Sequence, residues 1–525
     1  MSYLWNYWWI WKNKKRYTSR IVSRFLFRFC RRIKRIFMLT LNLSKSAEIP
    51  LYKQIYEYYA NEIRNGILKE KTKLPSVREL TKKLGVSKNT VESAYQQLCA
   101  EGYVVSVPKS GFVVTKVQEV FYHAEKNLQQ KIKETNLKIN EDLKSNVIDV
   151  SSSQVDESIF PSSVLKTLYR EAVSGNNSKK FLCRGNSLGE EDFRKTLANH
   201  LYESRGVKCS YEQIIIGAGT EYLLSLAVKI IEKYVSTTKK NNENKKLIFA
   251  VENPGYEKTE SIISDNGAIV KKINLDKDGI SVKEINETEI DCVYCTPSHE
   301  YPMGITMPIS RRSELLSWAY ELSNYDIKYD TKNMTNCRFI IEDDYDSDYR
   351  YQGNSIPALQ GFDTKDCVLY IGTFSRSLSP SMRVGYLVLP KRLMKVFCQD
   401  LSYYSNTVSR IEQFVLNKFI YDKHFERHIN RTRKLYEQRR NVLIKELKLT
   451  IPDIKIFGEE SGLHFIAKID DIKYDNLYMT IIKKASDKNL IIGGTESFLI
   501  FCYAHIDETK AKEIAQILCQ VLQEI

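Results

Sequence analysis

Three polar residues at the start of a predicted helix are candidates for binding chemistry: Lys88, Asn89 and Thr90. Apolar residues follow them at the helical spacing i, i+3, i+4 and i+7 and therefore face a core, namely Val91, Ala94, Tyr95 and Leu98. The ammonium, amide and hydroxyl groups are left exposed on the first turn. Such groups can bind base edges and phosphates when a helix enters a major groove.

The neighbouring residues predict the elements that hold this helix in place. Residues 74–80 open a short helix with Ser76 as its cap, and that helix ends at Gly85. Two helices joined by a tight glycine turn form a helix-turn-helix, whose second helix enters the major groove by its first turn. Two strand-like segments after it predict a β-wing, where the backbone and Lys109 can contact phosphate.

This segment resembles the GntR-type winged helix. The resemblance rests on the motifs at 50–55 (PLYKQI), 66–68 (GIL), 74–78 (LPSVR), 84–91 (LGVSKNTV), 94–95 (AY) and 101–103 (EGY). It implies that eight residues contact DNA: Ser76, Arg78, Ser87, Lys88, Asn89, Thr90, Lys109 and Gly111. For Arg78 or Lys88 taken singly, the alternative is a solvated surface charge.

The residues from 148 onward alternate apolar strand-like runs with helical stretches, which predicts an α/β domain around a largely parallel sheet. Gly219 and Thr220 follow one such strand and begin a predicted helix, whose N-terminus can bind an anion. The predicted strands are 213–217, 246–251, 292–295, 339–341 and 368–372.

This second region, residues 148–525, resembles the fold-type I aminotransferases, with a smaller C-terminal α+β subdomain implied. The motifs that carry the resemblance are 160–161 (FP), 204–207 (SRGV), 216–220 (IGAGT), 252–256 (ENPGY), 296–299 (TPSH), 341–347 (IEDDYDS) and 372–386 (GTFSRSLSPSMRVGY). A GntR-type winged helix joined to such a domain is the architecture of the MocR subfamily of regulators. The expected domains are a winged helix at 47–115, a linker at 116–147 and the aminotransferase-like domain at 148–525.

The resemblance implies a pyridoxal 5'-phosphate pocket. Asp343 falls where a carboxylate keeps the pyridine nitrogen protonated, Tyr345 where the ring hydroxyl is bound, and Tyr256 where an aromatic residue stacks on the ring. For Asp343 and Tyr256 the alternatives are a loop cap and a core residue. The implied phosphate ligands are Gly219, Thr220, Thr373, Ser375 and Arg383.

Three positions depart from the family pattern. Arg376 stands where the family has its Schiff-base lysine, and a guanidinium does not give up its proton in a protein. Ile500 stands where the substrate-carboxylate arginine is expected, and Arg184 where a tyrosine is usual. We therefore expect no catalytic residue and a pseudoenzyme, with Arg376 holding phosphate as a fixed cation.

The combined prediction is a cytoplasmic regulator that binds a double-stranded DNA operator as a head-to-tail homodimer. Its large domain would sense pyridoxal phosphate, bound noncovalently, or another small anionic effector. Two alternatives stay open: an enzyme with residual aminotransferase-like activity, and a regulator whose large domain is only a dimerisation scaffold.

The net charge of +15 comes mainly from the first 37 residues, which hold eleven Lys/Arg and no acid and leave +4 for the rest. One interpretation is a basic amphipathic helix on a membrane surface. The other is that translation starts at Met38, and then no membrane contact is expected.

Eleven cysteines, odd in number, indicate reduced thiols. Cys292 and Cys295 lie on a predicted strand and face opposite sides, so no metal site is expected.

Overall fold

The chain forms two compact units in a computed structural model, residues 1–142 and 143–525. The structure describes residues 43, 49–108, 110–116, 147–152, 154–174, 179–238, 246–321, 338–353, 355–469 and 476–525. The N-terminal segment 1–37, most of the expected linker and Lys109 lie outside these residues. Within the described residues no helix is long and apolar enough to cross a membrane.

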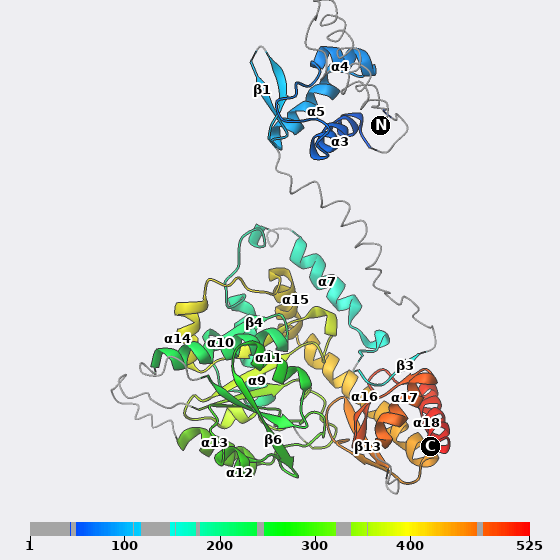
Figure 1. Ribbon diagram of the computed structural model, residues 1–525. Coiled ribbons are helices and arrows are strands. Elements are labelled where there is room, and N and C mark those ends of the chain that lie inside the picture. The colour runs from blue at the N-terminus through cyan, green and yellow to red at the C-terminus, as the bar shows by residue number, and fades with distance from the viewer. Residues whose placement is uncertain are drawn as a thin grey trace, which may run out of the picture. The chain divides into compact units, whose positions relative to one another are not determined.

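The described residues of the first unit form three helices and a two-stranded antiparallel sheet (Figure 1). The helices are α3 (Leu51–Arg64), α4 (Val77–Leu84) and α5 (Lys88–Ala100), and the strands are β1 (Val104–Val107) and β2 (Gly111–Val114). Residues spaced along α5 as expected, Val91, Ala94, Tyr95 and Leu98, are fully buried. The winged helix-turn-helix predicted from the sequence is confirmed.

The second unit is built around an eight-stranded sheet in the order β4-β11-β10-β9-β8-β5-β6-β7. Strands β10, β9, β8, β5 and β6 run parallel, whereas β11 is antiparallel to both of its neighbours. The bounds are β4 (Ile214–Gly217), β5 (Ile248–Asn253), β6 (Ile269–Asp276), β7 (Gly279–Ile280), β8 (Cys292–Cys295), β9 (Phe339–Asp344), β10 (Val368–Thr373) and β11 (Gly385–Val388). All five predicted strands are present, 292–295 with the same bounds as β8 and the others with ends that differ by one to three residues. The largest difference is in β9, which runs through Asp343, a residue that the sequence placed after the strand.

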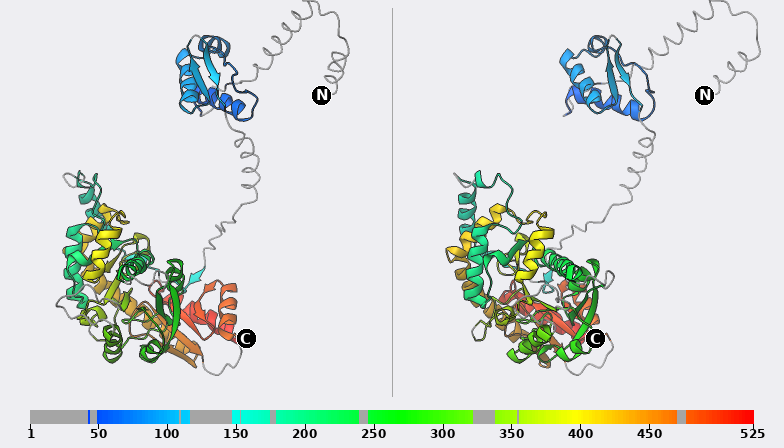
Figure 2. Two further views of the ribbon diagram at one scale, coloured as in Figure 1. Left: turned by 60° about the vertical axis from the view of Figure 1, so that its left-hand side comes forward. Right: turned by 90° about the vertical axis from the view of Figure 1, so that its left-hand side faces the viewer.

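Helices cover both faces of this sheet (Figures 1 and 2). On one face α10 (Thr220–Thr238), α11 (Glu257–Asp265) and α14 (Lys391–Val396) bury Cys292. The other face, which buries Cys295, packs against α12 (Val282–Asn286) and α13 (Ile309–Glu321), and farther along against α9 (Glu191–Arg205), α15 (Arg410–Tyr421) and α16 (His424–Thr450). The two cysteines therefore face opposite sides, as expected, and burial raises the pKa of both thiols.

A second, antiparallel sheet follows α16 in the order β12-β13-β16-β15. Its strands are β12 (Ile454–Phe457), β13 (His464–Ile469), β15 (Gly493–Thr495) and β16 (Phe498–Cys502), and helices α17 (Leu477–Asp487) and α18 (Glu508–Gln523) accompany them. A two-stranded parallel sheet pairs β14 (Leu490–Ile491) with β3 (Ile148–Asp149), and α7 (Ser162–Val173) follows β3 along the chain. This is the expected smaller α+β subdomain.

Candidate nucleic-acid interface and candidate ligand pocket

The first turn of α5 is fixed by its own cap. The Ser87 hydroxyl accepts a hydrogen bond from the Thr90 backbone N–H at 3.1 Å and lies 2.8 Å from the Thr90 hydroxyl. Lys88 and Asn89 are exposed beside it. Ser76 caps α4 in the same way, because its hydroxyl accepts a hydrogen bond from the Glu79 N–H at 3.2 Å. Arg78, two residues after Ser76, is exposed. Capping leaves the remaining backbone N–H groups of each first turn directed outward.

Tyr95 holds the two helices and the wing together. Its hydroxyl donates to the Pro75 carbonyl at 3.0 Å, in the turn that begins α4. Its ring packs edge-on against Tyr59 of α3 and Phe112 of β2. Gly111, at φ +93°, turns the wing into β2. The predicted DNA-contacting residues, apart from Lys109, which is outside the described part, are therefore carried by elements that share one small buried core.

A carboxylate with an unused oxygen lies at the end of β9 in the second unit. Asp343 is 4% exposed and accepts a hydrogen bond from the Tyr294 hydroxyl of β8 at 2.6 Å. Its other oxygen, Oδ1, is buried and has no hydrogen-bond partner among the described residues. Burial raises the pKa of Asp343 to about 7, against the lowering effects of Tyr294 and Arg376. A ring N–H is the kind of donor that this oxygen lacks.

Aromatic and imidazole side chains surround the same region. The Tyr345 hydroxyl lies 3.1 Å from His299 Nδ1, which also faces Asp346 at 3.0 Å. The rings of Tyr301 and His464 lie 5.1 Å apart, and Tyr256 meets Tyr301 edge-on at 6.1 Å. Tyr256 and Tyr345 are thus joined through Tyr301, whose ring packs edge-on against both.

Arg376 is the cation of this group. It is half-buried, and its charge acts on Asp343, Tyr345, Tyr301 and His464. Burial is the main cause of the raised pKa of Tyr301, about 12, and of the lowered pKa of His464, and the Arg376 charge lowers both. Ligand atoms of His299, Asp346 and His464 lie within 4.8 Å of one another, but the Arg376 charge, which acts on His464, opposes a metal cation there.

The predicted phosphate ligands form a second cluster around the N-terminus of α10. Gly219 has φ +89°, and a Cβ there would lie 2.7 Å from Arg383 Nη2, so only glycine leaves room for this guanidinium. Arg383 also pairs with Glu221 in the first turn of α10. A Cβ on Gly385, the strand partner of Thr373, would lie 3.4 Å from the Gly219 Cα.

Thr373 and Ser375 face one another beside this cluster. The Thr373 hydroxyl lies 3.0 Å from that of Ser375 and accepts the Ser375 N–H at 3.1 Å. Helix α10 begins at Thr220, so hydroxyls, N–H groups and a guanidinium meet at one helix N-terminus. This is the donor set of a phosphate site. Together with the unpartnered oxygen of Asp343, it fits a phosphorylated pyridine.

Ile500 and Arg184, the other two positions that depart from the family pattern, make their contacts outside these clusters. Ile500 is buried in β16 opposite Ile466, where it packs with Phe498 and Met303. Arg184 is exposed and donates to the Ser405 hydroxyl at 2.8 Å. Sequence reasoning did not select Tyr294, His299, Tyr301 or His464 as ligand-pocket residues. His299 lies in a quoted motif, but the others carry no local signal because their role depends on strand pairing.

Comparisons with known proteins show which families and folds the two units resemble. Residues 51–114 match the family "Bacterial regulatory proteins, gntR family". The chain is 36% identical to the uncharacterized HTH-type transcriptional regulator YdeL of Bacillus subtilis, over 81% of this chain and 86% of that protein. It is 28% identical to the probable rhizopine catabolism regulatory protein MocR of Rhizobium meliloti, over 81% of this chain and 83% of the relative.

The chain belongs to the MocR-type GntR transcriptional regulators. This MocR-type regulator is also 27% identical to the pyridoxine biosynthesis regulator PdxR of Corynebacterium glutamicum, over 82% of the chain and 86% of the relative. Among solved structures it matches the multiple substrate aminotransferase of Thermococcus profundus, with a TM-score of 0.59 and 20% identity over 77% of this chain and 96% of that one. That match shows the aminotransferase fold of the second unit.

Proposed function

We propose that this MocR-type regulator binds pyridoxal 5'-phosphate without a covalent bond, and that the bound ligand controls its attachment to DNA. The observation that carries the proposal is the buried, unpartnered Oδ1 of Asp343 together with the anion-binding cluster at the start of α10. A ring nitrogen would satisfy the first and a phosphate the second. PdxR, named for pyridoxine biosynthesis, supports the choice of ligand.

Each protein group has a defined part in holding the ligand. Thr220, Thr373, Ser375 and Arg383 supply donors to the phosphate, and Asp343 accepts a hydrogen bond from the protonated ring nitrogen. Tyr345 binds the ring hydroxyl, and Tyr256 covers a ring face. Pyridoxal phosphate in an enzyme supplies an electron sink for carbanions, through a bond to an amine. Arg376 does not offer a neutral amine, so this pocket retains the ligand and does not carry out transamination.

The regulator acts as a dimer in this proposal. A winged helix places one recognition helix in the groove, and a symmetric dimer reads two half-sites. The large domains pair head to tail, and ligand binding favours one arrangement of them, which changes the spacing of the two winged helices. The ligand affects DNA binding only to the extent that it binds the two arrangements with different affinities.

Calorimetry with pyridoxal phosphate, followed by DNA binding with and without ligand, tests the proposal. The DNA is the region upstream of the regulator's own gene. We expect binding with no mass added after borohydride reduction, and an altered operator affinity. No binding of pyridoxal phosphate, with operator binding intact, would favour another anionic effector or a dimerisation scaffold. A covalent adduct together with turnover of amino acids would favour the residual enzyme.

A further inference from the structure

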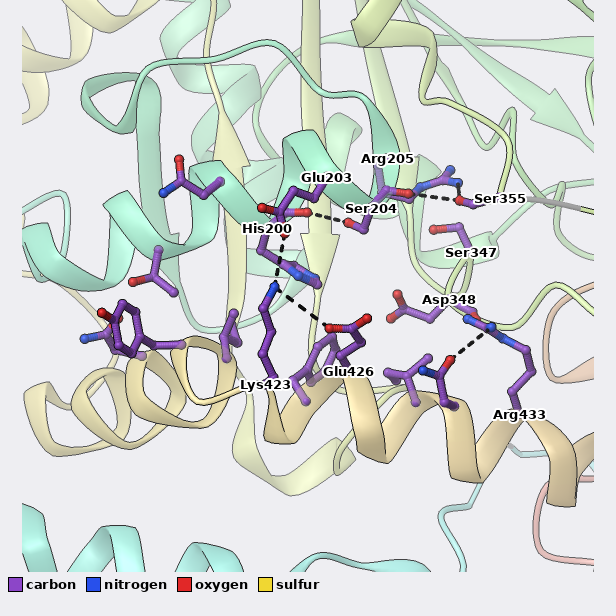
Figure 3. Close-up of a pocket in the computed structure, with 18 of the residues that line it drawn as sticks. His200, Glu203, Ser204, Arg205, Ser347, Asp348, Ser355, Lys423, Glu426 and Arg433 are labelled. Carbon is purple, nitrogen blue, oxygen red and sulfur yellow. Dashed lines mark hydrogen bonds and ion pairs between the residues drawn. The ribbon is translucent and has the colours of Figure 1, made fainter.

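A cleft of about 900 Å³ lies in the second unit, apart from the residues that surround Arg376. Its walls are α9, the 347–355 segment that follows β9, and the elbow where α15 meets α16 (Figure 3). None of the ligand-pocket residues described above lines it. We call it the elbow cleft.

The cations around the elbow cleft are mostly paired already. Arg205 donates to Asp344 Oδ2 at 2.9 Å and to the Ser298 hydroxyl at 2.7 Å. Lys423 pairs with Glu203 at 3.2 Å and with Glu426 at 3.9 Å. Arg433 donates twice to the backbone carbonyl of Asp348, at 3.0 and 2.9 Å. These positive charges offer little unsatisfied capacity to an anion, although Arg350 Nε is buried with no hydrogen-bond partner among the described residues.

Asp348 and Asn417, in contrast, offer acceptors in the elbow cleft that no described residue uses. The Asp348 side chain is half-buried, no described residue donates a hydrogen bond to its carboxylate, and Figure 3 shows it pointing into the space between α9 and α16. Asn417 Oδ1 is buried and also lacks a partner within the described part of the chain. Burial raises the pKa of Asp348 to about 6, with the charge of Asp344 adding to the effect.

The charged and titratable groups that act on or lie near Asp348 come from every wall. They are Asp192, Lys195, His200, Glu203 and Arg205 of α9, Asp344, Asp346 and Arg350 of the β9 segment, and Lys418, Tyr421, Lys423, Glu426 and Arg433 at the elbow. Arg205 and Arg433 lower its pKa, but burial outweighs them. The carboxylate is therefore charged at neutral pH and incompletely compensated.

The floor of the elbow cleft is apolar. Phe425, Ile429 and Ile420 are 3%, 5% and 6% exposed. The His200 ring packs edge-on against Phe425 at 5.3 Å, and burial lowers the pKa of His200 to about 4. The imidazole is thus neutral at physiological pH and adds aromatic surface without charge. This floor suits a hydrocarbon body.

We propose that the elbow cleft binds a small organic cation, a primary ammonium carried on a short apolar body. The ammonium pairs with the Asp348 carboxylate, Asn417 Oδ1 offers a further acceptor, and the body lies on Phe425 and Ile429. An ammonium has three donors and no acceptor, which matches the unused groups of the cleft. This site is separate from the pyridoxal phosphate pocket and does not rest on the function proposed above.

Calorimetry on the full chain at pH 8 tests this site with n-pentylamine and its neutral analogue n-pentanol. We expect pentylamine to bind, and to bind at least about tenfold more tightly than pentanol, because only the amine carries the charge. Asp348→Asn keeps the shape and removes the charge, so it should weaken pentylamine about tenfold or more. Asp265→Asn, the same change on the exposed end of α11, is the matched control and should bind as the native chain does.

Two results would overturn the proposal: no binding of pentylamine up to roughly 10 mM, or equal binding by the native chain and by a folded Asp348→Asn variant. The native chain supplies an independent measurement if that variant does not fold. Pentylamine affinity should fall between pH 8 and pH 5 as Asp348 takes up its proton, while His200 stays neutral in this range. An affinity that is constant with pH contradicts the pairing with Asp348.

Discussion

The Tyr294 hydroxyl donates to Asp343 at 2.6 Å, and this single bond leaves Asp343 Oδ1 with no hydrogen-bond partner among the described residues. Tyr294 thus fixes the orientation of the carboxylate and keeps one oxygen available. A buried carboxylate in this condition costs stability, and such costs are typical of binding sites. The first prediction follows from this pair.

Asp343→Asn should stabilise the ligand-free protein at pH 8 by about 1 to 2 kcal/mol and abolish pyridoxal phosphate binding. The folded-state pKa of about 7 lies above the ordinary value of 3.8, so the folded protein holds the proton more tightly than the unfolded chain. Stability from this group is therefore lost as pH rises from about 4 to about 7. Denaturant unfolding at pH 5 and pH 8 measures it, and a variant less stable than the native protein at pH 8 would contradict the argument.

Arg376→Lys should restore covalent attachment of pyridoxal phosphate. A lysine beside Asp343, Tyr345 and His464 provides an amine that can lose its proton, whereas the guanidinium cannot. Mass spectrometry after borohydride reduction should find one phosphopyridoxyl group per chain in the variant and none in the native protein. Arg383→Lys, at the phosphate cluster, is the control and should add no mass. Labelling of both variants alike would indicate nonspecific reaction.

Lys88→Ala should weaken operator binding about tenfold and reduce its dependence on salt, because Lys88 is exposed on the first turn of α5 and, apart from a solvent-exposed pair with Glu92, is free to meet a phosphate. A titration of binding against salt concentration measures both effects. Lys53→Ala, an exposed lysine of α3, should change the affinity much less. Equal losses from the two variants would favour a role for Lys88 as ordinary surface charge.

Ser87→Ala should destabilise the winged-helix unit by about 1 kcal/mol, because α5 loses the acceptor for the Thr90 N–H. Thermal unfolding followed by circular dichroism measures the change. Ser106→Ala, on an exposed position of β1, should leave the melting temperature nearly unchanged. If Ser87→Ala melts like the native protein, the cap contributes nothing to stability.

Sequence patterns could predict those parts of the protein whose interactions are local. The caps at Ser76 and Ser87, the apolar face of α5 and the start of α10 after Gly219 depend on neighbours within a few residues. The approach of Arg383 to Gly219 does not. The ligand-pocket roles of Tyr294 and His464 could not be predicted in this way. Tyr294 meets Asp343 because β8 and β9 pair in parallel, and His464 comes from the second sheet.

The elbow cleft had no sequence signal for a further reason. Its walls come from α9, from the segment after β9 and from the α15–α16 elbow, which lie far apart in the chain. Asp348 looks in sequence like an ordinary acidic loop residue. Only the packing of these elements places its half-buried carboxylate in the cleft, with no hydrogen-bond partner among the described residues.

Six consecutive residues, Asp343 to Asp348, run from the end of β9 in the ligand pocket to the wall of the elbow cleft. Tyr345 and Asp346 in this run contact His299, and the Asp348 carbonyl is held by Arg433 of α16. If an occupant of one site shifts this run, it changes the affinity of the other site. Thermodynamic linkage then requires the effect to be reciprocal and equal in free energy. A regulator built this way would respond to the joint concentration of two metabolites of opposite charge.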